Sequence, residues 1–119
     1  MEYKIKFTNI APSDNLKKIV IKKTNWVERY LNIKDFSMIF NVEFEKLTTR
    51  QRKGKIFRVE FNLPLPGKTI RIERVTDDMI KSLDEAKDVL KEEIKIYKEK
   101  MKEKEEREFR ELKRKQYNL

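Results

Sequence analysis

Residues 64–100, PLPGKTIRIERVTDDMIKSLDEAKDVLKEEIKIYKEK, decide the fold of this chain. A Pro66-Gly67 turn leads into alternating apolar and polar residues, and Asp77 and Asp78 separate this alternation from a long helical pattern. Thr76 or Asp77 can cap the helix with a side-chain oxygen. Asp77 and Asp78 also lie where the helix dipole favours negative charge. Apolar residues then recur at spacings of three and four, typical of one face of an α-helix: Met79, Leu83, Ala86, Leu90, Ile94, Tyr97 and Met101.

The charged residues of this helix are sorted by sign around its axis. At about 100° per residue, acidic residues face solvent: Glu85, Asp88, Glu92, Glu99 and Glu103. Lysines instead follow one shoulder of the apolar stripe: Lys87, Lys91, Lys95, Lys98 and Lys102. A row of positive charge beside a buried face is a candidate surface for a polyanion. The alternative is an ordinary solvated face with ion pairs between successive turns.

Composition limits the possible classes of protein. The chain has 119 residues and a formal net charge of +9, which suits one domain whose partner is nucleic acid or another anionic surface. It contains neither Cys nor His, which excludes disulfides, thiolate chemistry, the usual zinc sites and His-based catalysis. No apolar run approaches the roughly 20 residues of a membrane span. We therefore expect a soluble, cytoplasmic protein with no membrane partner.

The rest of the chain is predicted to supply one helix and the remaining strands. Tyr3, Ile5 and Phe7 alternate with polar residues as in a half-buried strand. Ser13 and Asp14 begin a helix with the apolar face Leu16, Ile19, Val20, Val27, Tyr30 and Leu31. Strands follow at 36–46, around 57–63, and around Ile70 and Ile72. The order β-α-β-β-β-α predicts an α+β two-layer sandwich, a four-stranded mixed sheet with parallel first and second strands and both helices on one face.

Two further groups of basic residues are candidates for binding. Lys22 and Arg29 share a shoulder of the first helix with Trp26, whereas Lys23 falls within the apolar face. A lysine there either extends its ammonium to solvent or meets a ligand. The loop 47–55 carries a second basic cluster, which can reach phosphates or simply form a solvated turn: Arg50, Arg52, Lys53 and Lys55.

The strand residues that face away from the helices argue against two common RNA-binding folds. They are mixed in sign and contain no aromatic residue, so the stacking surface of an RNA-recognition motif is missing: Lys4, Lys6, Asn41, Glu43, Glu45, Arg58, Glu60, Asn62, Arg71 and Glu73. The only glycines are Gly54 and Gly67, so the GXXG loop of a KH domain is excluded. Binding is therefore expected on the helical side and in the basic loop.

The last 18 residues differ from the predicted domain at 1–101. Residues 102–119 are strongly charged, and their apolar residues are few: Phe109, Leu112, Tyr117 and Leu119. We expect a helical extension or a disordered tail.

The chain resembles the family of ribosome hibernation-promoting factors and ribosome-associated inhibitors, in its short form. The resemblance covers residues 1 to about 100 and rests on several motifs in order: Ser13-Asp14-Asn15-Leu16, Lys22-Lys23, Leu65-Pro66-Gly67-Lys68, Asp77-Asp78-Met79, Leu83-Asp84, Val89-Leu90 and Tyr97-Lys98-Glu99-Lys100. The sequence departs from the family pattern at four positions, three of which reduce positive charge: Ile80, Val89, Glu93 and Ile96. It also stops short of the dimerisation domain of the long members.

The resemblance implies a fold like that of double-stranded-RNA-binding domains. It also implies binding to the small ribosomal subunit, in the channel of mRNA and tRNA at the A and P sites. By position, the resemblance assigns contacts with rRNA to Lys22, Lys23, Lys87, Lys91, Lys95 and Lys98. We include Arg29 and Lys102 as well, because they lie on the same shoulders of the two predicted helices. We expect a monomer that binds the small subunit, its rRNA and the assembled ribosome.

Three functions fit these features. The first is a translation inhibitor that blocks the decoding channel under stress. The second is a general binder of structured RNA, or an RNA chaperone, without ribosome specificity. The third is an interaction module whose C-terminal helix docks a protein. We expect no enzyme, cofactor or small-molecule substrate, because the many carboxylates are accompanied by no Gly-rich phosphate loop, nucleophile–base pair or metal cluster.

Overall fold

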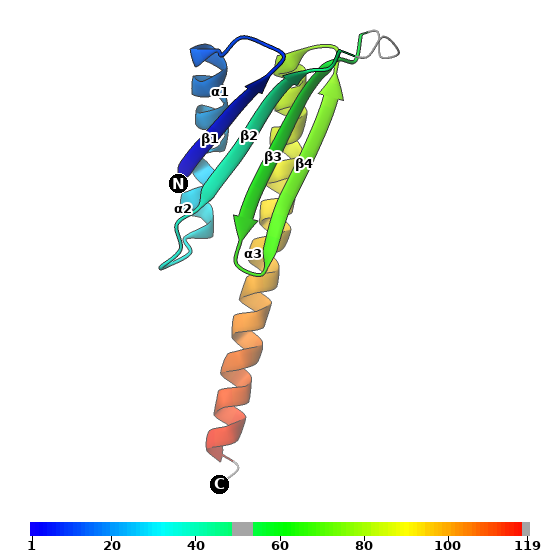
Figure 1. Ribbon diagram of the computed structural model, residues 1–119. Coiled ribbons are helices and arrows are strands. Elements are labelled where there is room, and N and C mark those ends of the chain that lie inside the picture. The colour runs from blue at the N-terminus through cyan, green and yellow to red at the C-terminus, as the bar shows by residue number, and fades with distance from the viewer. Residues whose placement is uncertain (49–53, 118–119) are drawn as a thin grey trace.

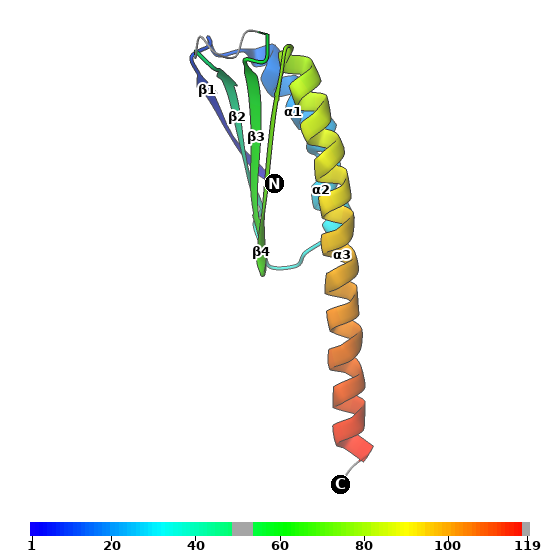
Figure 2. The same cartoon turned by 90° about the vertical axis from the view of Figure 1, so that its right-hand side faces the viewer.

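The computed structural model describes residues 1–48 and 54–117 (Figure 1). The elements are β1 (Glu2–Thr8), α1 (Asp14–Thr24), α2 (Trp26–Leu31), β2 (Ile39–Lys46), β3 (Phe57–Leu65), β4 (Lys68–Thr76) and α3 (Met79–Tyr117). The sheet has the order β1-β2-β3-β4, with β1 parallel to β2 and antiparallel pairing elsewhere. All three helices lie on one face of it (Figure 2). The predicted α+β two-layer fold is therefore confirmed.

The core fills the space between the sheet and the helices. Alternate residues of the central strands face it and are buried, and Val42, Phe61 and Ile72 lie opposite one another across three strands. The apolar face of α3 is buried against them as the periodicity predicts: Leu83, Ala86, Leu90, Ile94 and Tyr97. Each such side chain contributes about 1.5–3 kcal/mol by leaving water, so the position of α3 is fixed by its apolar face.

The predicted single helix at residues 14–31 is interrupted at Asn25, between α1 and α2. Thr24 donates its hydroxyl to the carbonyl of Val20 at 2.7 Å, and the indole of Trp26 donates to the carbonyl of Lys23 at 3.0 Å. Threonine bonding of this kind bends helices, and the indole occupies a carbonyl that the helix would otherwise use. Sequence periodicity alone does not register such side-chain competition.

Two element boundaries also differ from prediction. The strand expected from residue 36 begins at Ile39, because Asn32 and Asp35 have positive φ angles and turn the chain before it reaches the sheet. At the start of α3 the cap is Asp78 instead of Thr76 or Asp77: its carboxylate accepts the N–H of Ile80 at 2.9 Å. Thr76 supports this turn from the strand, because its hydroxyl accepts the N–H of Asp78 at 3.1 Å.

The helix α3 is much longer than the sheet that it covers. Its tyrosine Tyr97 donates to the carbonyl of Pro66 at 2.7 Å, in the β3–β4 turn where Gly67 adopts a φ of +79°. Beyond this point the helix continues past the sheet without a break to Tyr117 (Figures 1 and 2). The boundary between a domain at 1–101 and a tail therefore stays a prediction. Of the described helices, none is long and apolar enough to cross a membrane.

Candidate nucleic-acid interface

The lysine row of α3, defined as Lys87, Lys91, Lys95, Lys98 and Lys102, faces the side of α1 and α2. Two contacts establish this orientation. Asp84, on the same shoulder of α3, lies 2.6 Å from the ammonium of Lys23 on α1. The ammonium of Lys98 lies 4.1 Å from the ring centroid of Tyr30 on α2. The opposite shoulder faces β4, because Glu93 pairs with Lys68 at 3.6 Å. The structure thus places α1 and α2, which carry Lys22, Lys23 and Arg29, on the same side of α3 as the row.

Five of the predicted rRNA-binding residues present unneutralised charge. They are exposed, and in the described part of the chain none of them forms an ion pair, a side-chain hydrogen bond or a cation–π contact: Lys22, Arg29, Lys91, Lys95 and Lys102. Exposed cations on long side chains can follow the phosphates of a nucleic acid while their stems cover apolar surface. This arrangement suits a polyanion better than a small ligand.

The other three predicted residues are engaged within the protein. Lys23 is paired with Asp84, and its side chain is 31% exposed. Lys87 lies 3.4 Å from the carboxylate of its neighbour Asp88. Lys98 stacks on Tyr30 and also donates to the carbonyl of that residue, at the end of α2 where helix carbonyls lack partners. Nothing in these contacts tests binding to RNA, so the roles of these lysines stay predictions.

Trp26 belongs to the core edge in this structure. Its side chain is half-buried and packs against the core, its ring meets that of Tyr30 at 5.9 Å in an edge-on arrangement, and its N–H is occupied by the carbonyl of Lys23. The ring therefore braces α2 at the helix junction, beside the basic residues Lys22 and Arg29.

The open face of the sheet neutralises its own charge. Arg58 lies at the centre, with a side chain only 14% exposed, and four carboxylates surround it. Its guanidinium contacts Glu43 at 3.0 Å, Glu45 at 3.2 Å, Glu73 at 3.3 Å and also Glu60. A hydrogen bond from Thr8 at 2.6 Å, assisted by Arg58, lowers the pKa of Glu43. This face is consequently a poor surface for phosphate.

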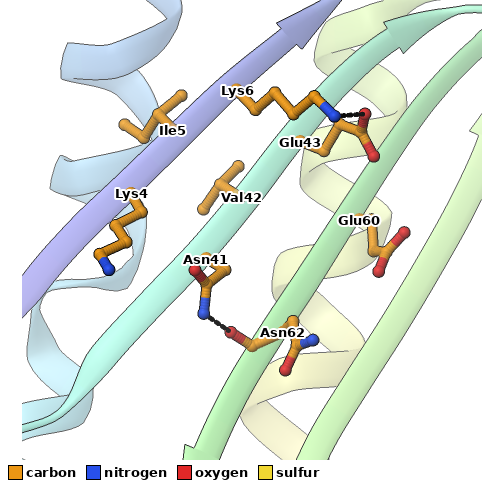
Figure 3. A pocket seen from close by; sticks show the side chains of 8 residues that line it. All are labelled: Lys4, Ile5, Lys6, Asn41, Val42, Glu43, Glu60 and Asn62. Atoms are coloured by element: carbon orange, nitrogen blue, oxygen red, sulfur yellow. Dashed lines mark hydrogen bonds and ion pairs between the residues drawn. The ribbon is translucent and has the colours of Figure 1, made fainter.

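A shallow pocket of about 500 Å³ lies on the same open face. Figure 3 shows Lys6 directed toward Glu43, at 3.9 Å, and Asn41 donating to the carbonyl of Asn62 at 3.3 Å. Glu43 and Glu60 lie directly opposite each other on β2 and β3. Two carboxylates beside the pocket would repel a phosphate, so the pocket does not extend the candidate interface.

The structure describes only part of the basic loop 47–55. Arg50, Arg52 and Lys53 lie outside the described residues. Lys55 is exposed and lines a hollow of about 470 Å³ together with Arg74, Lys81 and Glu85. Lys55 therefore lies beside β4 and the first two turns of α3, ahead of Lys87 where the lysine row begins.

Sequence reasoning did not identify two residues at the helix junction. In the sequence Asp84 stands out only as part of a motif, although its position three residues before Lys87 places a carboxylate on the same shoulder. Periodicity places Tyr30 on the apolar face, and its contact with Lys98, 68 positions away, leaves no local signal. In the described part of the chain no group of three or more His, Cys, Asp or Glu could hold a metal ion.

Most of the chain matches a known protein family and solved structures. The family model described as Sigma 54 modulation protein / S30EA ribosomal protein matches residues 3–102. The N-terminal domain of Protein Y from Thermus thermophilus has a similar structure, with a TM-score of 0.65, 24% identity, and coverage of 82% of this chain and 99% of that one. A ribosomal subunit interface protein from Coxiella burnetii gives a TM-score of 0.62, 25% identity, and 82% and 98% coverage. A search of curated proteins gives no match.

Proposed function

The chain belongs to the family of the Sigma 54 modulation protein and S30EA ribosomal protein, and from this premise we propose that it is a ribosome-associated translation inhibitor. The membership confirms the resemblance to hibernation factors that its motifs indicated. In our proposal the protein acts in the cytoplasm, binds the rRNA of the small subunit in the mRNA and tRNA channel, and blocks the A and P sites under stress. One copy is sufficient for this, and no catalytic step is involved.

One observation carries the proposal: the helical side of the molecule presents a row of exposed lysines on α3 whose charges are not neutralised by ion pairs in the described chain. Lys91, Lys95 and Lys102 on α3 extend along the side of the helix that faces α1 and α2, where Lys22 and Arg29 are also exposed. The row from Lys87 to Lys102 spans roughly 22 Å at 1.5 Å per residue. That length supports simultaneous contact with several phosphates.

The proposed mechanism is competition for space on the subunit. Each lysine that neutralises a phosphate releases condensed counterions, so affinity should fall steeply with salt. Such contacts position the protein but read no base sequence. Specificity for the ribosome would therefore come from the fixed shape of the helical face against folded rRNA, and inhibition from the exclusion of tRNA and mRNA.

A competition experiment tests this function against the second candidate. Labelled protein is bound to purified small subunits and challenged with tRNA, with mRNA, or with an RNA duplex of equal nucleotide content. We expect tRNA to displace the protein while the duplex has little effect. Equal displacement by the duplex would make the protein a general binder of structured RNA, and binding insensitive to salt would favour a protein partner.

A further inference from the structure

Two contacts join the helices of the candidate interface, and both use residues expected to bind rRNA. Lys23 of α1 pairs with Asp84 of α3 at 2.6 Å. Lys98 of α3 lies over the ring of Tyr30 of α2 and donates to the carbonyl of that residue. We call these two contacts the helix ties. Among the described residues, no other hydrogen bond or ion pair links α3 to α1 or α2.

The two helix ties are well separated along α3. Asp84 and Lys98 are 14 residues apart, which corresponds to roughly 21 Å at 1.5 Å per residue. Lys91 and Lys95 lie between them on the same shoulder. In addition to the apolar packing beneath the helices, a tie at each end of this stretch restrains both the distance and the relative rotation of α3 and the first two helices, whereas a single contact would restrain one end only.

The tied lysines are poorly placed to add phosphate contacts of their own. The charge of Lys23 is neutralised by Asp84, whose side chain is 43% exposed and would repel a phosphate that approached. The ammonium of Lys98 is already held by an aromatic face and a carbonyl at the end of a helix, both of which favour a cation. Moving it to a phosphate would break both contacts.

We propose that Lys23 and Lys98, with Asp84 and Tyr30, are positioning residues that hold the two basic surfaces at the spacing of the rRNA site. Under this inference the phosphate contacts come from Lys22 and Arg29 on one side and from Lys91, Lys95 and Lys102 on the other. The inference rests on the proposed function, because it assigns separate roles within the same site. It reverses the sequence-based expectation for Lys23 and Lys98.

The decisive experiment removes the partners of the lysines and leaves the lysines themselves unchanged. Asp84→Asn raises the net charge by one, and Tyr30→Leu leaves it unchanged. If Lys23 and Lys98 contact phosphate directly, freeing them should strengthen binding to small subunits and steepen the salt slope by roughly 0.7–0.9 for each lysine released. If they position the helices, both variants should bind about 3- to 10-fold more weakly although no positive charge is lost.

Conservative variants and a control of stability complete the test. Every variant at this position keeps the backbone carbonyl, but Tyr30→Phe also keeps the aromatic ring that Tyr30→Leu removes, so wild-type affinity should return. Each variant must show the wild-type circular dichroism spectrum at the temperature of the assay. Unchanged or tighter binding by Asp84→Asn and Tyr30→Leu would overturn the positioning role, as would equally weak binding by Tyr30→Phe.

A second measurement keeps the result independent of the proposed function. Amide hydrogen exchange of the free protein should become faster in α1 and α2 when either tie is removed, while the strands stay protected. If exchange in α1 and α2 stays at the wild-type rate, the ties do not hold these helices in place, and this conclusion does not depend on any measurement with ribosomes. Failure of the wild-type protein to bind small subunits would instead reject the proposed function alone.

Discussion

The two faces of the molecule carry similar residue types in opposite arrangements. On the open sheet face, Lys6 and Arg58 stand among four carboxylates, and every one of these acids contacts Arg58. On the helical face, most acidic residues of α3 lie on its solvent side, with Asp84 and Glu93 as exceptions, while the lysine row stands on the side of α1 and α2. The two faces thus differ in the spatial separation of positive from negative charge, which the net charge of +9 does not describe.

The two arrangements also differ in what their charges do for the protein. The network around Arg58 stabilises the sheet, because it pairs charged groups on neighbouring strands and lowers the pKa of Glu43. The exposed lysines of the lysine row, Lys91, Lys95 and Lys102, form no such ion pairs among the described residues. Exposed cations that stand close together without a stabilising partner are candidates for binding a polyanion. The predictions below test this division of roles.

The largest effect should follow from neutralising the free lysines of α3. In the triple variant Lys91→Gln, Lys95→Gln and Lys102→Gln, three exposed cations without an ion pair in the described chain are lost. The slope of log affinity against log salt for small subunits should become shallower by about two to three units. Thermal stability should change little, since exposed substitutions usually stay within about 0.5 kcal/mol.

A charge-matched variant controls for net charge. Lys4→Gln, Lys46→Gln and Lys100→Gln remove three exposed lysines that lie away from the lysine row. This control should keep its ability to exclude tRNA, although general attraction to RNA weakens slightly. Equal loss of binding in both triple variants would show that the protein is held by its net charge, and the comparison between the faces would fail.

The second prediction breaks the network of the open face. Arg58→Met removes, at a largely buried position, the cation that Glu45, Glu60 and Glu73 share. We expect a loss of about 1–3 kcal/mol in unfolding free energy at pH 7, below the value for fully buried pairs because Glu73 is more than half exposed. Urea unfolding measures this loss, and the salt slope of ribosome binding should stay unchanged. A change in that slope would place the open face in the interface.

The third prediction concerns acid. The folded state lowers the pKa of Glu43, first through the hydrogen bond from Thr8 and then through Arg58, against the burial that raises it. The stabilisation is therefore complete above the ordinary glutamate value of about 4.3 and is lost as the pH falls through the lower folded value. Thr8→Val removes the main cause, so the variant should be less stable than the wild type above the ordinary glutamate value, and the difference should shrink as the pH falls because the variant has less of this stabilisation to lose. Urea midpoints at pH 3 to 6 measure the difference; a difference that stays constant over this range would contradict the prediction.

The sequence predicted what depends on local periodicity. Spacings of three and four placed Leu83, Leu90 and Ile94 in the core, and alternation placed Ile70 and Ile72 in a buried strand, as the structure confirms. The parallel pairing of β1 with β2 followed from the crossover connection. These features repeat along several residues, so no single side chain decides them.

What escaped prediction depends on single side chains and distant partners. The break at Asn25 arises from hydrogen bonds of Thr24 and Trp26 that compete with the helix. The pair of Lys23 and Asp84 joins residues 61 positions apart, so the sequence could mark Lys23 as unusual without naming its partner. The row on α3 could be predicted because it follows helical geometry, whereas the separation of free from tied lysines required coordinates.

The last prediction concerns the smallest effect, removal of the extension after residue 101. Its apolar residues contribute little to the core: Phe109, Leu112 and Tyr117 are 59%, 62% and 85% exposed. Deletion of residues 102–119 should therefore shift the melting temperature by no more than about 2 °C, because a shift of 4–8 °C corresponds to about 1 kcal/mol in a domain of this size. It also removes Lys102, which should cost roughly one unit of salt slope at most.

If the extension lies along the path of mRNA, the truncated protein will compete less well with mRNA than with tRNA. The control is Lys102→Gln in the full chain: a variant that reproduces both losses would show that one lysine accounts for the extension. A large fall in melting temperature on truncation would show instead that the long end of α3 is part of the folded body.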